Sequence, residues 1–277
     1  MANKLKHLFC ILMGKPVFIE SMGWQEVYPS LSKYVYFIPH PNYRKEKIDI
    51  IQQYHVSLPK IETILNDVLN KWFEIKCESS LQVFVSTIID SNLMTLEDIF
   101  LRQAKALESY HRDTVLEKGY FIDENDYKQI VEIMITSVED RIIQSLKDKL
   151  KSTLKHANQY GFQKRIKDVI RMLPEELRVL VLAGGKLSKF AKDITDNRDY
   201  YTHYGKKPDN LFDFKQLISM RTKLKVALLY AYLKELGLDD DLINQCILED
   251  YRIAQQLNAK KKEVDFEIPS FLAGDEK

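Results

Sequence analysis

The chain contains few of the residues that break regular structure. Its 277 residues include 9 glycines and 8 prolines, fewer than a turn-rich β fold of this length normally has. Hydrophobic residues account for 45% of the chain and charged residues for 29%, which is enough to bury the core of one large domain or two modest ones. The shortage of glycine and proline therefore favours long helices.

The patterns that bind metals and cofactors are also lacking. The three cysteines, Cys10, Cys77 and Cys246, are far apart and odd in number, so we expect neither a disulfide framework nor a zinc site. The six histidines fall in no HxxxH or HExxH spacing, and there is no phosphate-binding glycine loop and no nucleophile elbow. We therefore predict no metal, no cofactor and a reducing cytoplasmic location.

An excess of charge of one sign and a long apolar run are both absent. The 41 basic and 40 acidic residues leave a net charge of +1, which argues against a broadly cationic nucleic-acid coat but permits a local basic patch. No apolar run reaches about 20 residues, so no membrane span is expected. The short apolar stretch 8–13 is followed by Lys15 and has no clear cleavage site, so we expect no signal peptide.

The first ninety residues differ in pattern from the rest. The β-branched and aromatic stretches 17–19 and 34–38 predict two short strands. Apolar residues at helical spacing predict a helix over 57–73, and stretch 80–89 favours a helix while leaving a strand open. Two or three strands cannot bury both faces of a sheet alone. We therefore expect a small α+β segment over 1–92, either the remnant of a larger N-terminal domain or a layer docked on the following helices.

From Met94 onward the pattern is helical only. Thr95 and Asp98 form an approximate capping box for a helix that runs to about Arg112. Apolar periodicity and end signals predict further helices at 126–158, 162–172, 175–182, 186–204, 212–236 and 239–257. The predicted fold class is therefore mainly α, with a helical bundle over 93–258 and a polar, disordered tail over 259–277.

The remaining candidate for chemistry is Arg198, which Asp199 follows directly and His203 follows after five residues. RNA cleavage without a metal needs a proton-transfer group near neutral pH, which histidine provides. It also needs a fixed cation on the phosphate, for which arginine is suited, while the ribose 2′-OH supplies the nucleophile. Such a pair arises by chance in roughly one comparable chain in five. Spacing alone favours a solvated arginine and a capping histidine at a helix end.

The context of this pair resembles the HEPN superfamily, in its ApeA-like branch. Four segments in the right order carry the resemblance, as a first-helix motif, a middle helix, a catalytic stretch and a following helix: 106–112, 162–167, 197–204 and 217–237. The resemblance covers about residues 94–257. One departure is Asp199, where asparagine is commoner in the family, and it places a negative charge beside the arginine.

The resemblance implies a HEPN-like helical domain that acts as a metal-independent RNA endonuclease. It implies a homodimer in which two Arg/His motifs meet, with RNA (tRNA among the candidates) as the substrate and a role in abortive antiphage defence. Arg198 and His203 are then the catalytic residues, and Asn197 and Asp199 support them. Residues five apart on an ideal helix point about 140° from each other, so one chain alone does not bring the pair together unless the helix ends or bulges.

Other side chains are weaker candidates. Glu108 and His111 can line the site from the first helix, although a buried polar pair that orders the bundle is the favoured interpretation. Tyr204, with Tyr200 and Tyr201, can stack on bases, whereas such tyrosines more often belong to a core or an interface. We also name Lys206 and Lys207 as candidates to bind the RNA backbone, with a solvated loop as an equal alternative.

Two other functions stay open at this point. The chain can be a non-catalytic helical HEPN-like module that binds RNA or a protein partner, because such domains also occur without activity. It can also be a structural or regulatory dimer subunit whose N-terminal part senses a signal. We favour the ribonuclease because four matched segments in order are more specific than one Arg/His pair.

Overall fold

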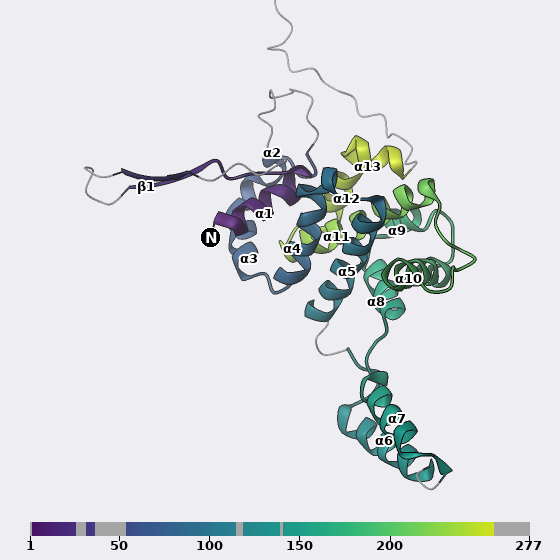
Figure 1. Cartoon of the computed structure of the whole chain (residues 1–277). Helices are drawn as coiled ribbons and strands as arrows, with labels where there is room; N and C mark the ends of the chain where they lie inside the picture. Colours follow the sequence, from purple (N-terminus) through teal and green to yellow (C-terminus); the bar gives the residue numbers. More distant parts are fainter. Residues whose placement is uncertain (1, 26–31, 37–53, 115–118, 139–140, 258–277) are drawn as a thin grey trace, which may run out of the picture.

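The computed structural model describes residues 2–25, 32–36, 54–114, 119–138 and 141–257, and it confirms the mainly α fold class (Figure 1). The predicted tail 259–277 lies outside these residues. None of the helices in the described ranges is long and apolar enough to cross a membrane. The domain boundary near residue 92 stays a prediction, although one hydrophobic core includes buried residues from both sides of it.

The N-terminal segment is mostly helical and carries one β-hairpin. Its elements are α1 (Ala2–Met13), β1 (Ser21–Gln25), β2 (Ser32–Tyr36), α2 (Leu58–Ile61), the 3-10 turn η1 (Glu62–Ile64), α3 (Leu65–Glu74) and α4 (Glu78–Ile89). The strands pair antiparallel, with Ser21 opposite Tyr36. The strand expected at 17–19 is wrong, because Val17 donates its N–H to Sγ of Cys10 at 3.3 Å and packs against the core instead.

The bundle is built around α5 (Leu96–Thr114), which follows the turn η2 (Ser91–Leu93). The predicted capping box is present, since the amide of Asp98 donates to Oγ1 of Thr95 at 3.1 Å and the carboxylate of Asp98 accepts from the Thr95 amide. Helix α5 packs against α4 on one side and against α8 (Phe162–Met172), α10 (Leu187–His203) and α11 (Phe214–Glu235) on others. The site described below lies on this helix and its neighbours.

Helix α11 is the most deeply buried helix of the bundle. Every residue from 226 to 233 is buried, as expected for a helix that has neighbours on all sides. Its cap is the full box between Asp213 and Gln216. Around it lie α9 (Glu175–Leu182), α12 (Asp240–Glu249) and α13 (Tyr251–Gln256) (Figure 1).

The long helix predicted over 126–158 is wrong. The chain forms two helices, α6 (Glu124–Val138) and α7 (Gln144–Ala157), which fold back on each other and project from the body as a hairpin (Figure 1). A single helix here has no surface to cover its apolar stripe, whereas folding back lets the two halves cover each other. The backbone is extended at Ile143, with ψ of 152°, so the break needs no glycine or proline.

The single helix predicted over 239–257 is likewise wrong, because Asp250 divides it into α12 and α13. The buried carboxylate of Asp250 caps α13 by accepting from the amides of Arg252 and Ile253. It also accepts a hydrogen bond from Nδ1 of buried His55 at 2.6 Å. A continuous helix does not leave Asp250 in a position to make all of these bonds, so the long-range pair with His55 accounts for the break.

Candidate active site

The candidate residues lie at the C-terminal end of α10. Buried Phe190, Ala191 and Ile194 recur at helical spacing and fix the inner face of this helix. The helix ends directly after His203, because Tyr204 adopts the left-handed conformation with φ of 47° and its amide donates to the carbonyl of Tyr200. A non-glycine residue is rarely found in this conformation, and no local residue pattern predicted it at Tyr204.

Asn197 fastens this end of α10 to the loop that follows. Its side chain is fully buried. Its Nδ2 donates to the backbone carbonyls of Asp193 at 2.8 Å and Asn210 at 2.9 Å, and its Oδ1 accepts from the amide of Phe212 at 2.7 Å. Each donor or acceptor of a buried amide side chain that lacks a hydrogen-bond partner lowers the stability of the fold. We therefore place Asn197 as a positioning residue that holds the loop, and not as a group that faces solvent.

Arg198, the next residue, is held by three different elements. Its Nη2 donates to Oε2 of Glu108 on α5 at 3.1 Å, and its Nη1 donates to Oδ1 of Asp199 at 3.0 Å. The guanidinium also lies over the ring of Phe162 on α8, with Cζ 4.8 Å from the ring centroid. A cation over an aromatic face is stabilised by the ring quadrupole. Arg198 is thus fixed in orientation while 34% of its side chain stays exposed.

Glu108 connects two arginines. Its Oε1 accepts from Nη2 of Arg112 at 2.8 Å while its Oε2 accepts from Arg198. Only 17% of the Glu108 side chain is exposed, so these charge-assisted bonds are stronger than those of a fully solvated pair. Glu108 thus contacts Arg198 from the first helix of the bundle. Its predicted role in supporting activity stays a prediction.

His203 is exposed and forms no hydrogen bond or ion pair with the described part of the chain. Helix α10 is unbroken from Arg198 to His203, so the two side chains leave the helix in different directions. Arg198 turns toward α5 and α8, and no bond joins it to His203. Within one copy of the chain, the imidazole is therefore available to solvent but does not converge on the guanidinium.

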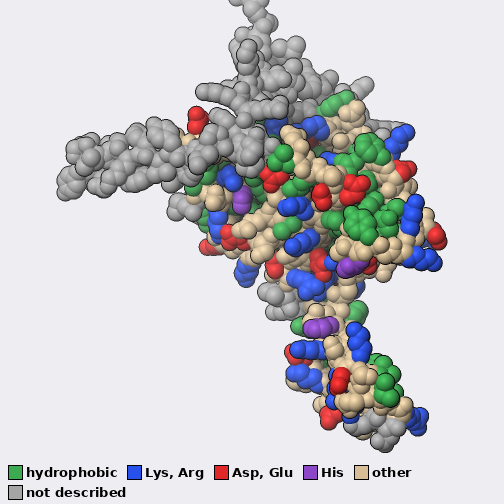
Figure 2. Space-filling view, in the orientation of Figure 1, with side chains coloured by type: hydrophobic (Ala, Val, Ile, Leu, Met, Phe, Trp, Pro, Cys, Tyr) green, Lys and Arg blue, Asp and Glu red, His purple; other side chains and the backbone are tan. Residues whose placement is uncertain are grey.

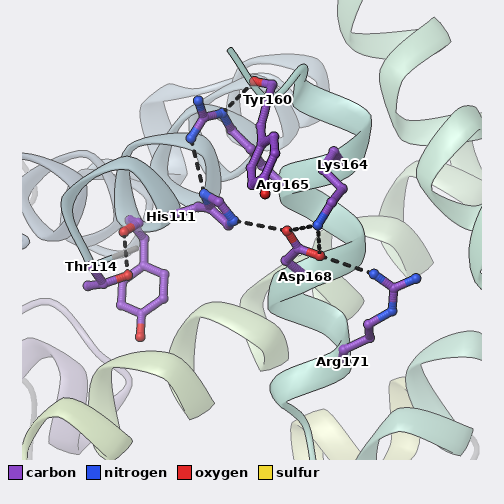
Figure 3. A network of polar contacts seen from close by, with 8 residues as sticks. His111, Thr114, Tyr160, Lys164, Arg165, Asp168 and Arg171 are labelled. Carbon is purple, nitrogen blue, oxygen red and sulfur yellow. Dashed lines mark hydrogen bonds and ion pairs between the residues drawn. The ribbon is translucent and has the colours of Figure 1, made fainter. Parts of the chain in front are cut away.

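His111 does not reach Arg198 but belongs to a separate buried network on α5 and α8 (Figure 3). Arg165 donates from Nη1 to Nδ1 of His111 at 3.0 Å, so Nδ1 must carry a lone pair. The ring proton then sits on Nε2, which donates to Asp168 at 3.3 Å. Burial lowers the pKa of His111, against the effect of Asp168. The favoured interpretation was a buried polar pair of Glu108 and His111, but His111 bonds to Arg165 and Asp168, whereas Glu108 bonds to Arg112 and Arg198. A role of His111 in the site stays a prediction.

The loop after α10 forms one side of an open groove of about 770 Å³. Four lysines line it. Lys189 and Lys192 form ion pairs with aspartates one turn later on α10. Lys206 and Lys207 are exposed and form no ion pair within the described ranges. These two lysines are therefore the cations of this groove that can accept a phosphate without first leaving a carboxylate.

The three tyrosines divide between core and surface. Tyr201 packs edge-on against buried Phe100, with centroids 6.2 Å apart, and its hydroxyl reaches the carbonyl of Phe212. Tyr204 is 74% exposed, and its ring lies 5.9 Å from that of Tyr200. Tyr204 is thus the member of the group that is free to stack on a base.

Two parts of the site went unrecognised in the sequence. The sequence analysis included Phe162 only as part of the segment 162–167 and predicted no role for it. Its stacking under Arg198 depends on how α8 packs on α10, which the sequence does not show. Asn210 was not considered, although it donates to Asp193 at 2.7 Å and Asp196 at 3.1 Å while its carbonyl binds Asn197. Within the part of the chain that the structure describes, no group of three or more His, Cys, Asp or Glu side chains is placed to hold a metal ion.

Comparison with known proteins gives one match. A family model described as Apea-like HEPN matches residues 101–242, just over half of the 277 residues. No curated protein and no solved structure matches the chain. The matched region runs from α5 to the start of α12, so it contains Glu108, Arg198 and His203, and all four segments that carried the resemblance lie inside it.

Proposed function

The chain belongs to the Apea-like HEPN family, and from this premise we propose that it is a metal-independent RNA endonuclease with Arg198 and His203 as its catalytic residues. The observation that carries the proposal is the state of Arg198. Its guanidinium is oriented by Glu108 and Phe162 and still 34% exposed. A cation whose orientation is fixed in advance stabilises a developing phosphate charge more effectively than a mobile one, and the exposed part of the guanidinium is accessible to a substrate.

The proposed reaction uses the substrate's own nucleophile. The 2′-oxygen attacks the adjacent phosphorus while a histidine removes its proton, and the bond from phosphorus to the 5′-oxygen breaks. The 5′-oxygen takes up a proton as it leaves. The products are a 2′,3′-cyclic phosphate and a free 5′-hydroxyl. Two proton-transfer groups on opposite sides of the phosphorus serve this reaction better than one.

We assign those two groups to two copies of the chain. One copy carries a single His203, which points away from its own Arg198 and forms no bond with described residues. A second copy placed across the end of α10 would supply the second imidazole and the second guanidinium. On one helix, residues five apart point about 140° from each other, so Arg198 and His203 of the same copy do not meet. In this arrangement each guanidinium meets the histidine of the other copy instead.

RNA binding is assigned to the exposed side of the following loop. Lys206 and Lys207 lie in the groove without ion pairs to the described residues, and Tyr204 is exposed beside them. Replacing both lysines by glutamate should weaken RNA binding and lower its salt dependence by about two counterions. Lys189→Ala is the matched control, because Lys189 lines the same groove but is already paired with Asp193.

The test of catalysis is cleavage of tRNA and other RNA in EDTA, with products resolved by gel and mass spectrometry. We expect cleavage by the natural chain, and a loss of about 10²-fold or more in Arg198→Ala and His203→Ala. Arg178→Ala is a matched control, since Arg178 is also an ion-paired arginine and is 33% exposed. Cleavage that both active-site variants retain at full rate would overturn the proposal.

A non-catalytic module remains the alternative function and predicts a different result. RNA binding would survive in His203→Ala, and no product would form with any chain. At the level of the cell we propose a role in antiphage defence. Expression should then reduce phage yield, and His203→Ala should abolish the reduction without changing the amount of folded protein.

A further inference from the structure

Three aromatic residues, Tyr120, Phe121 and Tyr160, lie where the α6–α7 hairpin joins the body, and we call them the junction aromatics. Phe121 is 60% and Tyr120 46% exposed. The ring of Phe121 packs edge-on against that of Tyr160, with centroids 4.9 Å apart, and Nζ of Lys164 lies 4.6 Å from the Tyr160 centroid. Exposed aromatic rings beside cations are the kind of surface on which proteins stack the unpaired bases of single-stranded RNA.

Backbone hydrogen bonds hold the junction aromatics in a fixed arrangement. The amide of Phe121 donates to the carbonyl of Asn158 at 3.0 Å. The amide of Tyr160 donates to the carbonyl of Gly119 at 2.8 Å, which ties the two chain segments at the base of the hairpin together. An exposed ring on such a backbone loses little freedom when a ligand contacts it, and this lowers the entropic cost of binding.

A second exposed arginine lies beside Arg198. Glu108 accepts from Arg198 with Oε2 and from Arg112 with Oε1, so one carboxylate group separates the two guanidiniums. Of the Arg112 side chain 52% is exposed, against 34% for Arg198. Two guanidiniums on the same carboxylate are close enough to bind two successive phosphates of one strand.

Arg165 connects Arg112 to the junction aromatics. Its Nε donates to the carbonyl of Tyr160 at 3.0 Å, and its Nη1 donates to Nδ1 of His111, the residue before Arg112, at 3.0 Å (Figure 3). Burial, and then the charge of Arg112, lower the pKa of Arg165, while Tyr120 acts in the opposite direction. Arg112 and Tyr120 therefore both lie near this one buried side chain.

Positive charge prevails on this surface. Among the described residues, the carboxylates of Glu108, Asp168 and Asp199 lie among five cations, which are Arg112, Lys164, Arg165, Arg171 and Arg198. Asp123, two residues after Phe121, directs its carboxylate to the start of α6, where it accepts from the amide of Asn125 at 2.7 Å. Figure 2 shows Lys and Arg side chains on the body beside its junction with the hairpin. An excess of cations favours a polyanion over an apolar peptide as the ligand.

We propose that Arg112 and the junction aromatics form a second subsite for the RNA strand that Arg198 binds. Arg112 contacts the phosphate next to the scissile one, and an unpaired base of the same strand stacks on Phe121. A base inside a duplex is already stacked on its neighbours, so the subsite selects single-stranded segments such as loops and free ends. The subsite rests on the proposed function, because Arg198 is taken as the residue at the scissile phosphate.

The test measures binding of RNA that cannot be cleaved, so that it does not depend on catalysis. The probe is a fluorescent 2′-O-methyl oligonucleotide of about eight nucleotides, which lacks the 2′-OH nucleophile. It is used as a single strand and annealed to its complement, and fluorescence anisotropy gives the affinity of the whole chain for each form. Phe9→Ala is the matched control for Phe121→Ala, because Phe9 is 47% exposed and lies on α1.

We expect Phe121→Ala to bind the single strand about tenfold more weakly, which is the contribution of one stacked base, and to bind the duplex as the natural chain does. Phe121→Trp should keep the affinity for the single strand, and Phe9→Ala should bind both forms normally. Equal weakening of single-strand and duplex binding in Phe121→Ala would overturn the proposal. Full single-strand affinity in that variant, or no single-strand binding by the natural chain, would overturn it as well.

Arg112→Gln should lower the slope of log affinity against log salt by about 0.7 for the single strand, as expected for the loss of one phosphate contact. Arg102→Gln is the matched control, because Arg102 is also exposed on α5 but donates to Ser86. If Arg112 only positions Glu108, the cleavage rate changes and this slope does not, and that result would contradict the proposal. Binding differences of the expected kind without any cleavage of RNA would refute the proposed function and support the subsite as an RNA-binding surface.

Discussion

Helix α11 and the helices of the α6–α7 hairpin have very different surroundings. Twelve of the 22 residues of α11 are buried, against one of 15 in α6 and none of 14 in α7. All three have apolar residues at helical spacing. The spacing therefore indicates that a helix forms, but it does not indicate whether the body of the same chain covers its apolar stripe.

Tyr160 joins the base of the hairpin to the body. The carbonyl of Tyr160, at the base of the hairpin, accepts from Nε of buried Arg165 at 3.0 Å. The ring of Tyr160 lies 4.6 Å from Nζ of Lys164 (Figure 3). Two residues further on, Phe162 lies under Arg198. The body thus positions the candidate site, and α6 and α7 project away from it (Figure 1).

The largest expected effect contrasts a buried residue in each region. Leu228→Ala removes a fully buried side chain from α11 and should lower the free energy of unfolding by about 3 kcal/mol. Ile135→Ala in α6 should lower it by less than about 1 kcal/mol, because few body contacts are lost. Chemical denaturation of both variants measures the contrast. Equal losses would show that the hairpin is part of the same cooperative core.

A second difference is that the body buries a titratable pair, whereas α6 and α7 bury no titratable side chain. Burial lowers the pKa of His55 to about 4, and nearby Lys225 adds to this effect. The geometry agrees, because Nδ1 donates to Asp250 while buried Nε2 has no hydrogen-bond partner among the residues that the structure describes. A proton added at Nε2 would therefore be buried without an acceptor from these residues.

The sign of the pH dependence follows from this pKa. Between pH about 6.5 and about 4 the unfolded chain binds a proton at His55 that the folded chain does not. Stability should therefore fall by about 3 kcal/mol as the pH drops through that window. Melting temperatures of the natural chain and of His55→Gln measure it. An equally steep loss in His55→Gln would assign the effect to other groups.

The sequence predicted those helices whose ends have local signals. The helices at 162–172 and 175–182 have the expected bounds, since Gly161, Pro174 and Gly184 mark their limits. The breaks at Ile143 and Asp250 carry no such signal. The first arises because α7 folds back on α6, and the second because His55, 195 residues away, pairs with Asp250. Both causes are tertiary contacts, which local periodicity does not contain.

The same limit applies to the candidate site. Residue type and spacing identified Arg198 and His203, and the ordered segments identified Glu108. The sequence did not distinguish Glu108, which reaches Arg198, from His111, three residues later, which is buried against α8. One helical turn separates the two residues, so only the packing of α8 and α10 decides which of them meets the arginine.

A smaller effect is expected from the ion pair between Asp199 and Arg198. Asp199 accepts from Arg198 at 3.0 Å and is 52% exposed. Asp199→Asn removes this negative charge and leaves a side chain of the same shape. Because an exposed pair contributes at most about 1 kcal/mol, cleavage should rise by no more than about fivefold. Initial rates in EDTA test this, and a fall of tenfold or more would instead make the Asp199 carboxylate part of the chemistry.

The smallest expected effect is also the most direct test of the contrast between the two regions. Ile122 and Asn158 lie side by side at the base of the hairpin, where the Asn158 side chain both donates to and accepts from the Ile122 backbone. An Asn-Gly turn in place of residues 123–157 can therefore close the chain with favourable hairpin geometry. We expect the melting temperature of the body to stay within about 3 °C, since little apolar surface of the body is uncovered. Cleavage of RNA by this variant then shows whether the active site needs the hairpin, because Arg198 keeps Glu108 and Phe162. Unfolding of the shortened chain would mean that residues 123–157 contribute to the stability of the body.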